Sequence, residues 1–239
     1  MKITASMVKD LRTKTGAGMM DCKKALVEAE GDMDKAVDIL REKGLSQAAK
    51  KASRVAAEGA VVSAISEDGK TGTIVEVNCE TDFVGSNEDF RALAASIAQQ
   101  IIAVNPADVE ALLASDLNGK TVKDTVTEAV AKIGENISVR RFVRYESAEG
   151  KVYSYIHGGG KIGVLVEVKG GDDELGKDIA MQIAAANPTY VCREEVPADV
   201  LDKEKEILLA QMANDPKTAN KPEAVKEKMI LGKVGKFYK

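Results

Sequence analysis

Tryptophan is absent from this 239-residue chain, and aromatic residues make up only 4% of it. Alanine, valine and isoleucine must therefore fill most of the interior, which suits helices packed on small sheets. Hydrophobic residues account for 44% of the chain. That content is enough for a real core and allows roughly one to three domains.

Cysteine and histidine are also scarce. The three cysteines, Cys22, Cys79 and Cys192, lie far apart and none belongs to a CxxC motif. This spacing indicates neither a disulfide framework nor a zinc site. The sequence also has no Walker loop, dinucleotide fingerprint or HExxH motif. We find no credible catalytic set and no metal site, so we expect a binding protein and not an enzyme.

Long apolar runs are missing, since no stretch approaches the ~18 residues that a membrane span needs. The chain starts directly with an amphipathic pattern and shows no signal or transit peptide. We therefore expect a cytoplasmic protein. The net charge of −4 argues against a chain that coats nucleic acid. Lys50, Lys51 and Arg54 form one basic stretch, either a solvated helix end or a small patch for an acidic partner.

Residues 1–56 have the pattern of a small helical module. Thr4 and Asp32 are suited to cap the first and third of three short helices. Glycines predict the ends of the helices, with Gly44 ending the third. Three helices in this space resemble ubiquitin-associated (UBA) modules, and residues 45–56 read as a linker helix.

Beyond Gly59 the apolar residues no longer recur at helical spacing and instead alternate every two residues, which is typical of strands. Strands are predicted at 60–65, 73–77, 137–145, 152–156 and 164–168, with the first two forming a hairpin. Helices are predicted at 88–103, 107–115, 121–133 and 173–186. Helical patterns at 198–212 and 222–231 predict an antiparallel hairpin that projects from the core.

An internal repeat links two parts of the chain. Gly72–Val77 and Gly163–Val168 share a Val-Glu-Val pattern, and the helices that follow both end in Asn-Pro. The repeat predicts an α+β core of two antiparallel three-stranded sheets with helices on one face. The strands are offset by 91 residues and the Asn-Pro pairs by 82, so the first copy carries nine extra residues. This insertion includes 79–85, and loops held on a rigid scaffold often carry function.

Within the insertion, Thr81-Asp82-Phe83-Val84 has two interpretations that spacing alone does not separate. Phe83 could fold back into the core while Asp82 caps the next helix. Alternatively, Phe83 could be an exposed wedge beside a carboxylate. Burying one phenylalanine in a partner would contribute roughly 1.5–3 kcal/mol. The carboxylate could then disturb a metal and phosphate bound by that partner.

Two other features suggest partner contacts. His157 is the sole histidine and precedes three glycines; it lies either in a simple glycine turn or in a turn that contacts a partner. An esterase-like oxyanion loop is excluded because no Gly-x-Ser-x-Gly motif is present. Met19 and Met20 are adjacent at a helix start, so we expect one of them to be exposed and available for an adaptable contact.

Three segments resemble signatures of the bacterial elongation factor Ts family: Leu11–Leu26, Glu76–Val84 and Lys132–Ile137. The similarity covers essentially the whole chain. It implies guanine-nucleotide exchange on elongation factor Tu, without covalent chemistry, a cofactor or direct nucleic-acid binding. Family members continue beyond the stretch that matches the end at Lys239 and return a segment to the second core half, so we expect that segment to be missing here.

The resemblance also implies roles for individual residues. Arg12, Met19, Met20 and Lys23 would contact the GTPase domain, and Thr81, Asp82, Phe83 and Val84 would dislodge Mg²⁺ near the nucleotide. His157 would touch another domain of the GTPase, and the helical hairpin would be a coiled-coil or homodimerisation element. The expected divisions are 1–56, 57–139, 140–190 and 191–239. One alternative is an adaptor that binds a partner through residues 1–56 alone; another is a hydrolase that uses His157.

Overall fold

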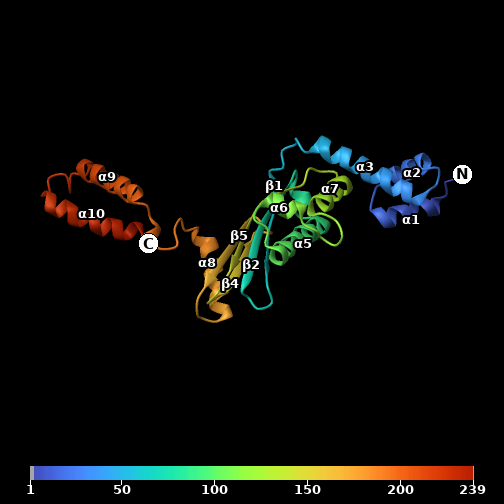
Figure 1. Cartoon of the computed structure of the whole chain (residues 1–239). Coiled ribbons are helices and arrows are strands. Elements are labelled where there is room, and N and C mark those ends of the chain that lie inside the picture. The colour runs from blue at the N-terminus through green and yellow to red at the C-terminus, as the bar shows by residue number, and fades with distance from the viewer. Residues whose placement is uncertain (1–2, 239) are drawn as a thin grey trace. The chain divides into compact units, whose positions relative to one another are not determined.

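The computed structural model describes residues 3–238. The chain divides into two compact units, residues 1–186 and 187–239. The first unit contains a helical bundle and a core with two sheets, and the second is a pair of helices (Figure 1). Among the described residues, no helix combines the length and apolar character needed to cross a membrane.

The N-terminal bundle consists of α1 (Ala5–Thr15), α2 (Met19–Glu28) and α3 (Met33–Lys51). The predicted caps are confirmed. The Thr4 side chain accepts a hydrogen bond from the Met7 N–H, and the Asp32 side chain accepts from two N–H groups of α3. The bundle has its own apolar core, which includes Val8, Leu11, Cys22, Ala25, Leu26, Ala29 and Ala36.

Gly44 does not end the third helix, contrary to the sequence prediction. Instead α3 continues through Gly44 to Lys51 as one helix, including most of the predicted linker helix. Gly44 is buried, and a Cβ atom there would lie 3.2 Å from the Cβ of Ala131 on α7. The glycine is therefore explained by close helix packing and not by helix termination.

The first sheet has the order β1-β2-β3 and is antiparallel throughout. Its strands are β1 (Glu58–Ile65), β2 (Thr71–Cys79) and β3 (Ser138–Glu146). Four helices lie between β2 and β3 in sequence: α4 (Asp82–Gly85), α5 (Glu88–Val104), α6 (Val109–Ala114) and α7 (Val122–Ile133). The second sheet pairs β4 (Lys151–His157) with β5 (Ile162–Val168), and α8 (Asp173–Ala186) follows.

These elements confirm the predicted α+β class, but the second sheet has two strands among residues 3–238 and not the three we expected. The reason lies in the chain order. In the first half, β3 follows α7 and pairs with β2, whereas in the second half α8 is followed by helical segments. No third strand is therefore supplied to β5 within the described residues.

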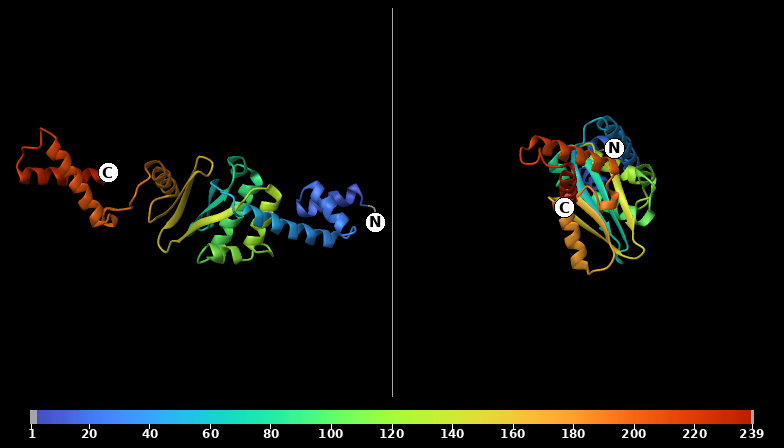
Figure 2. Two further views of the ribbon diagram at one scale, coloured as in Figure 1. Left: turned by 90° about the horizontal axis from the view of Figure 1, so that it is seen from above. Right: turned by 90° about the vertical axis from the view of Figure 1, so that its left-hand side faces the viewer.

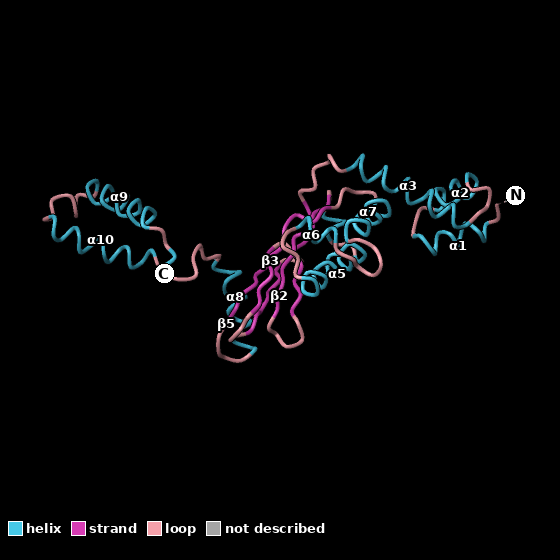
Figure 3. Tube along the Cα trace, in the orientation of Figure 1, coloured by secondary structure: helices cyan, strands magenta, loops and turns pink. Residues whose placement is uncertain are grey.

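The core is layered, with the two sheets facing each other between helices (Figures 2 and 3). On one side, α5 packs on β1 and β2; on the other, α8 packs on β4 and β5. The main apolar cluster lies under α5 and α7 and includes fully buried Phe90, Ile97, Ile101, Val75 and Val77. Helices thus cover one face of each sheet, as the repeat predicts.

Contacts between the sheets follow the 91-residue offset of the repeat. Ser63 donates a hydrogen bond to Ser154, its counterpart 91 residues later, at 3.0 Å between the two hydroxyl oxygens. The backbone N–H of Val61 donates to the Gly160 carbonyl, and that of Val152 donates to the Gly69 carbonyl, both at 2.8 Å. Val152 is the counterpart of Val61 under the 91-residue offset, and Gly160 is the counterpart of Gly69. Each of the two bonds is therefore the repeat equivalent of the other. The halves are therefore related by an approximate two-fold symmetry.

Gly72 and Gly163 occupy equivalent positions in this interface. A Cβ on Gly72 would lie 2.5 Å from Val152, and one on Gly163 would lie 2.6 Å from Val61. Real Cβ atoms do not approach other atoms so closely, so only glycine fits at either position. The sheets can pack face to face because both halves keep this glycine.

The matching Asn-Pro pairs have a common backbone conformation. Asn105 at the end of α5 and Asn187 after α8 both have φ of 46°. This left-handed conformation ends a helix, and asparagine tolerates it better than most residues. The following proline cannot continue a helix, so the sequence repeat reflects a repeated helix stop.

The second unit contains the short 3₁₀ helix η1 (Arg193–Glu195), then α9 (Ala198–Asn214) and α10 (Glu223–Phe237). The predicted pairing of these helices is confirmed by a small core of Leu208, Met212, Ile230 and Val234. The guanidinium of Arg193 lies 5.0 Å from the centre of the Tyr238 ring. This cation–π contact joins the two ends of the unit.

Candidate functional site

The segment Thr81–Val84 forms the start of a one-turn helix, α4, between β2 and α5. Thr81 is its N-cap, and Asp82 is exposed in its first turn. Phe83 is 85% exposed, so it does not fold back into the core. Asp82 does not cap α5 either, because the Asn87 side chain accepts the hydrogen bonds from the first N–H groups of α5. The structure therefore excludes the core-packing interpretation of this segment.

Only one side of α4 is packed against the protein. Val84 is partly buried against the main core, and Gly85 is buried. A Cβ on Gly85 would lie 3.1 Å from the carbonyl oxygen of Gly59 on β1, so this glycine permits a close approach of two backbones. Asp82 and Phe83 are left on the solvent side.

The chain just before α4 is held by the loop that follows α7. Glu135 in that loop accepts hydrogen bonds from the N–H groups of Glu80 and Thr81, both at 3.0 Å, and from the Thr81 hydroxyl at 2.6 Å. Sequence reasoning did not identify Glu135 as a functional residue. Its only signal was its place in the third family-like segment, Lys132–Ile137.

Cys79 lies at the end of β2, directly beneath this loop. Its thiol donates a hydrogen bond to the Thr81 carbonyl at 3.1 Å. Burial raises the pKa of the Cys79 thiol to about 11, and the negative charge of Glu135 adds to this effect. The thiol is therefore protonated at neutral pH and acts as a structural donor and not as a nucleophile.

The turn after His157 lies at the same end of the core as α4. Arg91, near the start of α5, donates to the Gly159 carbonyl at 2.8 Å, and Lys161 forms an ion pair with Glu58. The hydrogen bond that Lys161 donates to Glu58 raises the pKa of Lys161, and the nearby charge of Asp82 contributes in the same direction. Two segments predicted separately are thus brought close together.

His157 itself is exposed at the end of β4. Its Nδ1 lies 3.0 Å from the hydroxyl of Tyr155, and the two rings are stacked with centroids 5.9 Å apart. This pairing holds the imidazole against a neighbouring side chain on the same strand. The ring stays accessible to a partner, and no serine, threonine or cysteine side chain is hydrogen-bonded to it within residues 3–238.

Arg12, Met19, Met20 and Lys23 are all exposed at the corner between α1 and α2. Met19 is 59% exposed and Met20 is 60% exposed, so the expected exposed methionine is present and its neighbour is exposed as well. The inner face of α2 is filled by Cys22, Ala25 and Leu26. These four residues belong to the bundle, whose apolar core is separate from the core beneath α4.

The nine extra residues of the first repeat are spread over three elements. Compared with β5, β2 extends two residues further; the connection to the next helix is four residues longer; and α5 is three residues longer than α8. The insertion is therefore not confined to a loop. Only the four residues in the connection give room for the extra turn of α4.

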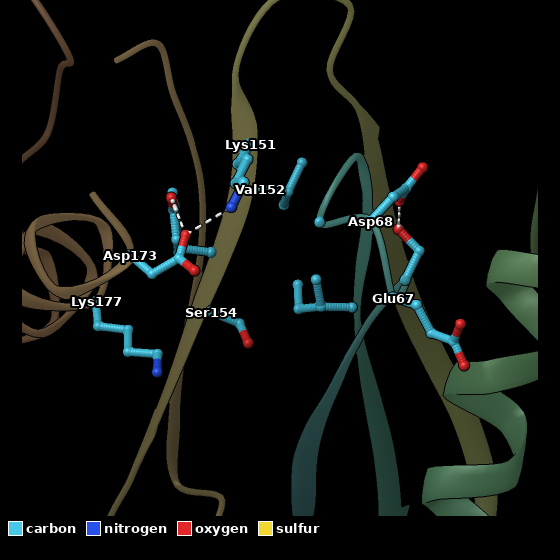
Figure 4. Close-up of a pocket in the computed structure, with 11 residues that line it drawn as sticks. Glu67, Asp68, Lys151, Val152, Ser154, Asp173 and Lys177 are labelled. Atoms are coloured by element: carbon cyan, nitrogen blue, oxygen red, sulfur yellow. Dashed lines mark hydrogen bonds and ion pairs between the residues drawn. The ribbon is translucent and has the colours of Figure 1, made fainter. Parts of the chain in front are cut away.

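The equivalent end of the second half is an open pocket lined by the β1–β2 turn, the start of β4 and the first turns of α8 (Figure 4). Asp173 accepts hydrogen bonds there from Lys151 at 2.8 Å and from the Tyr153 hydroxyl at 3.0 Å. These polar groups satisfy one another, which leaves little for a ligand. Within residues 3–238, no three His, Cys, Asp or Glu side chains are grouped to hold a metal ion.

Comparisons with known proteins agree with the family resemblance seen in the sequence. The family model described as elongation factor TS matches residues 80–239. A protein named elongation factor Ts from Halorhodospira halophila is 53% identical over 236 residues, covering 99% of this chain and 79% of that protein. Proteins of the same name from Clostridium perfringens and Alkalilimnicola ehrlichii are 54% and 50% identical, with 79% and 80% of their lengths covered. The chain therefore belongs to the elongation factor Ts family of translation elongation factors.

Proposed function

We propose that the chain promotes guanine-nucleotide exchange on elongation factor Tu, with α4 as the element that acts on the nucleotide site. The observation that carries this proposal is the exposure of Phe83, which reaches 85% on a one-turn helix next to the exposed carboxylate of Asp82. A large exposed aromatic side chain beside a charge suits insertion into a partner. Family membership supports elongation factor Tu as that partner.

The physical logic of exchange fits such a wedge. An exchange factor must bind the nucleotide-free GTPase more tightly than the loaded one, and nucleotide must weaken the factor by the same ratio. Phe83 would gain roughly 1.5–3 kcal/mol by burial in the partner. Asp82 would bring a negative charge toward Mg²⁺ and phosphate, whose binding depends on local charge. Thr81 and Val84 would support the wedge from beneath.

Other exposed surfaces would complete the contact. In this proposal the N-terminal module, residues 1–56, docks on the GTPase domain through Arg12, Met19, Met20 and Lys23, and His157 contacts a second domain. Methionine side chains adapt well to protein surfaces. The proposed activity consists of protein–protein binding in the cytoplasm. It involves no covalent chemistry, no cofactor and no direct contact with nucleic acid.

The helical hairpin, residues 191–239, is proposed as a homodimerisation element. Its small internal core leaves apolar side chains on the surface, with Leu231 69% exposed and Ile207 44% exposed. Burying them between two copies would remove apolar area from water. The apparent mass as a function of concentration tests this part, and a strictly monomeric chain would contradict it.

Release of labelled GDP from elongation factor Tu tests the main proposal. Catalytic amounts of the chain should accelerate release, and Phe83→Ala should remove most of the acceleration. If the folded chain left release at its spontaneous rate, exchange activity would be ruled out. If residues 1–56 bound the GTPase as tightly as the full chain and Phe83→Ala had no effect, the adaptor alternative would be favoured.

A further inference from the structure

The chain segment just before α4 is held by one carboxylate, that of Glu135. Three donors from two consecutive residues converge on Glu135: the N–H groups of Glu80 and Thr81 reach Oε2, and the Thr81 hydroxyl reaches Oε1. These N–H groups follow the last residue of β2 and precede α4, so neither the sheet nor the helix ladder satisfies them. Hydrogen bonds to a charged acceptor are stronger than those between neutral groups.

The contact is reciprocal. It joins the loop before α4, at Glu80 and Thr81, to the loop after α7, at Glu135 and Asn136, and we call this set of contacts the clasp. Glu80 accepts a hydrogen bond from the Asn136 N–H at 2.7 Å, while Glu135 holds the N–H of Glu80 in return. The side chain of Asn136 donates to the Arg54 carbonyl at 2.8 Å, and the Arg54 guanidinium lies 3.5 Å from Glu80. The clasp thus also fixes the chain segment that enters the core from α3.

The clasp matters because the packing of α4 on the core is limited to its Val84 and Gly85 side. A four-residue helix is far too short to be stable on its own. Phe83 has almost no packing in the free protein, so contacts of its own side chain do not fix its position. The Thr81 hydroxyl accepts a long hydrogen bond from the Val84 N–H, at 3.4 Å, while donating to Glu135. The orientation of the N-cap therefore depends on Glu135, which holds the Thr81 N–H and hydroxyl, together with the Cys79 thiol, which holds the Thr81 carbonyl.

We propose that Glu135 is a positioning residue that fixes the direction of Phe83 and so prepares the wedge before the partner arrives. This inference rests on the proposed exchange function. Binding is more favourable when the contacting group is already ordered, because less conformational freedom is lost on association. Glu135 would touch neither the nucleotide nor Mg²⁺, and would act only through α4.

The test uses the full chain with Glu135→Ala and the milder Glu135→Gln, which keeps the side-chain size and one acceptor oxygen. Glu135→Ala should lower the maximal rate of GDP release about tenfold, and Glu135→Gln about threefold. A matched control is Glu128→Ala. Glu128 lies on α7, close to Glu135 in sequence, but its carboxylate forms an exposed ion pair with Lys120. That change should leave the rate within about a factor of 1.5.

A double variant separates positioning from general stability. In a Phe83→Ala background, Glu135→Ala should have almost no further effect, because the group it positions has been removed. An equal tenfold loss in both backgrounds would overturn the proposal. If Glu135→Ala does not fold, Glu135→Gln supplies the same comparison, checked by an unchanged melting temperature.

A second measurement does not involve the GTPase at all. Amide hydrogen exchange, followed by mass spectrometry, should become faster at residues 80–85 in both Glu135 variants but stay unchanged in β2. Unchanged protection at 80–85 would contradict the positioning role. If protection falls as expected but the wild-type chain does not accelerate GDP release, the exchange proposal fails while the structural role of Glu135 stands.

Discussion

The two halves of the core differ most clearly at a pair of aspartates that lie 91 residues apart, Asp82 and Asp173. Each is the first residue of a helix that follows the second strand of its half. Asp173 starts α8 directly and is tied to Lys151 and Tyr153. Asp82 instead starts the extra turn of α4 and is exposed beside Phe83. Equivalent positions thus serve hydrogen bonds within the protein in one half and a candidate contact in the other.

This difference shows how a repeated scaffold can carry an unsymmetrical site. The sheet interface keeps equivalent contacts in both halves, including the paired glycines and the Ser63–Ser154 hydrogen bond. The four extra connecting residues lie outside that interface, at one end of the core. A change there adds a surface element without disturbing the contacts on which the fold depends.

The largest expected effect is at Phe83. Phe83→Ala should slow factor-stimulated GDP release roughly 10- to 100-fold, because the wedge loses its apolar area. The melting temperature should stay nearly constant, since the ring is exposed. Leu175→Ala is the matched control, because Leu175 is an exposed apolar side chain in the first turn of α8. Equal losses of activity in both variants would remove the functional distinction between the halves.

The symmetry of the interface can be tested with the two interface glycines, Gly72 and Gly163. Gly72→Ala and Gly163→Ala should each lower the free energy of unfolding by about 1–3 kcal/mol, because the new methyl group would overlap with side chains of the opposite sheet. The two losses should be similar in urea unfolding. Gly232→Ala in α10, where a Cβ meets no atom within 4 Å, should not destabilise the chain. A large loss at only one of the two interface positions would contradict the two-fold relation.

Asp82 should have a smaller effect than Phe83. Asp82→Asn keeps the side-chain size but removes the charge proposed to disturb Mg²⁺, so GDP release should slow roughly three- to tenfold. The effect should shrink when Mg²⁺ is removed by chelation, because the charge would then have no ion to displace. An undiminished effect without Mg²⁺ would assign Asp82 a role in ordinary contact instead.

The smallest effect is expected at Asp173, and it should appear in stability alone. The hydrogen bonds from Lys151 and Tyr153 lower the pKa of Asp173 below its ordinary value of 3.8. A lowered pKa in the folded state gives stability that is present above pH 3.8 and is lost as the pH falls through the folded value. Asp173→Asn should therefore melt slightly below the wild type at pH 7, and the difference should shrink below about pH 4. A difference that grows with acidity would exclude this ion pair as the cause.

Much of the fold is predictable because the hydrophobic periodicity is strong. The strands and helices of the core other than α4, a segment expected as a loop, fall within about two residues of the expected ranges, since apolar side chains repeat at periods of two and 3.6. Gly44 was misjudged because glycine commonly ends helices. Its actual role depends on the position of Ala131 on α7, which local sequence does not contain. Tertiary packing overrides local preference at such positions.

The candidate site was only partly predictable for a similar reason. The repeat and the family resemblance singled out Thr81–Val84, but residue spacing alone left the direction of Phe83 open. Glu135 was missed as a support because it follows Thr81 by more than 50 residues, and no periodic pattern joins the two. Met19 and Met20 are both exposed because the inner face of α2 is complete without them, which depends on how the three helices pack together.

The hydrogen bond between Ser63 and Ser154 has a consequence for how such a core can evolve. Each serine meets its own counterpart, as residues on the axis of a symmetric homodimer do. In a dimer, any inserted residue would appear in both subunits, and the assembly would fall apart on dilution. Covalent linkage of the halves removes the dependence on concentration. Covalent linkage also lets one half change at its surface while the packing between the two sheets is preserved. A single chain can therefore present one aromatic wedge and not two.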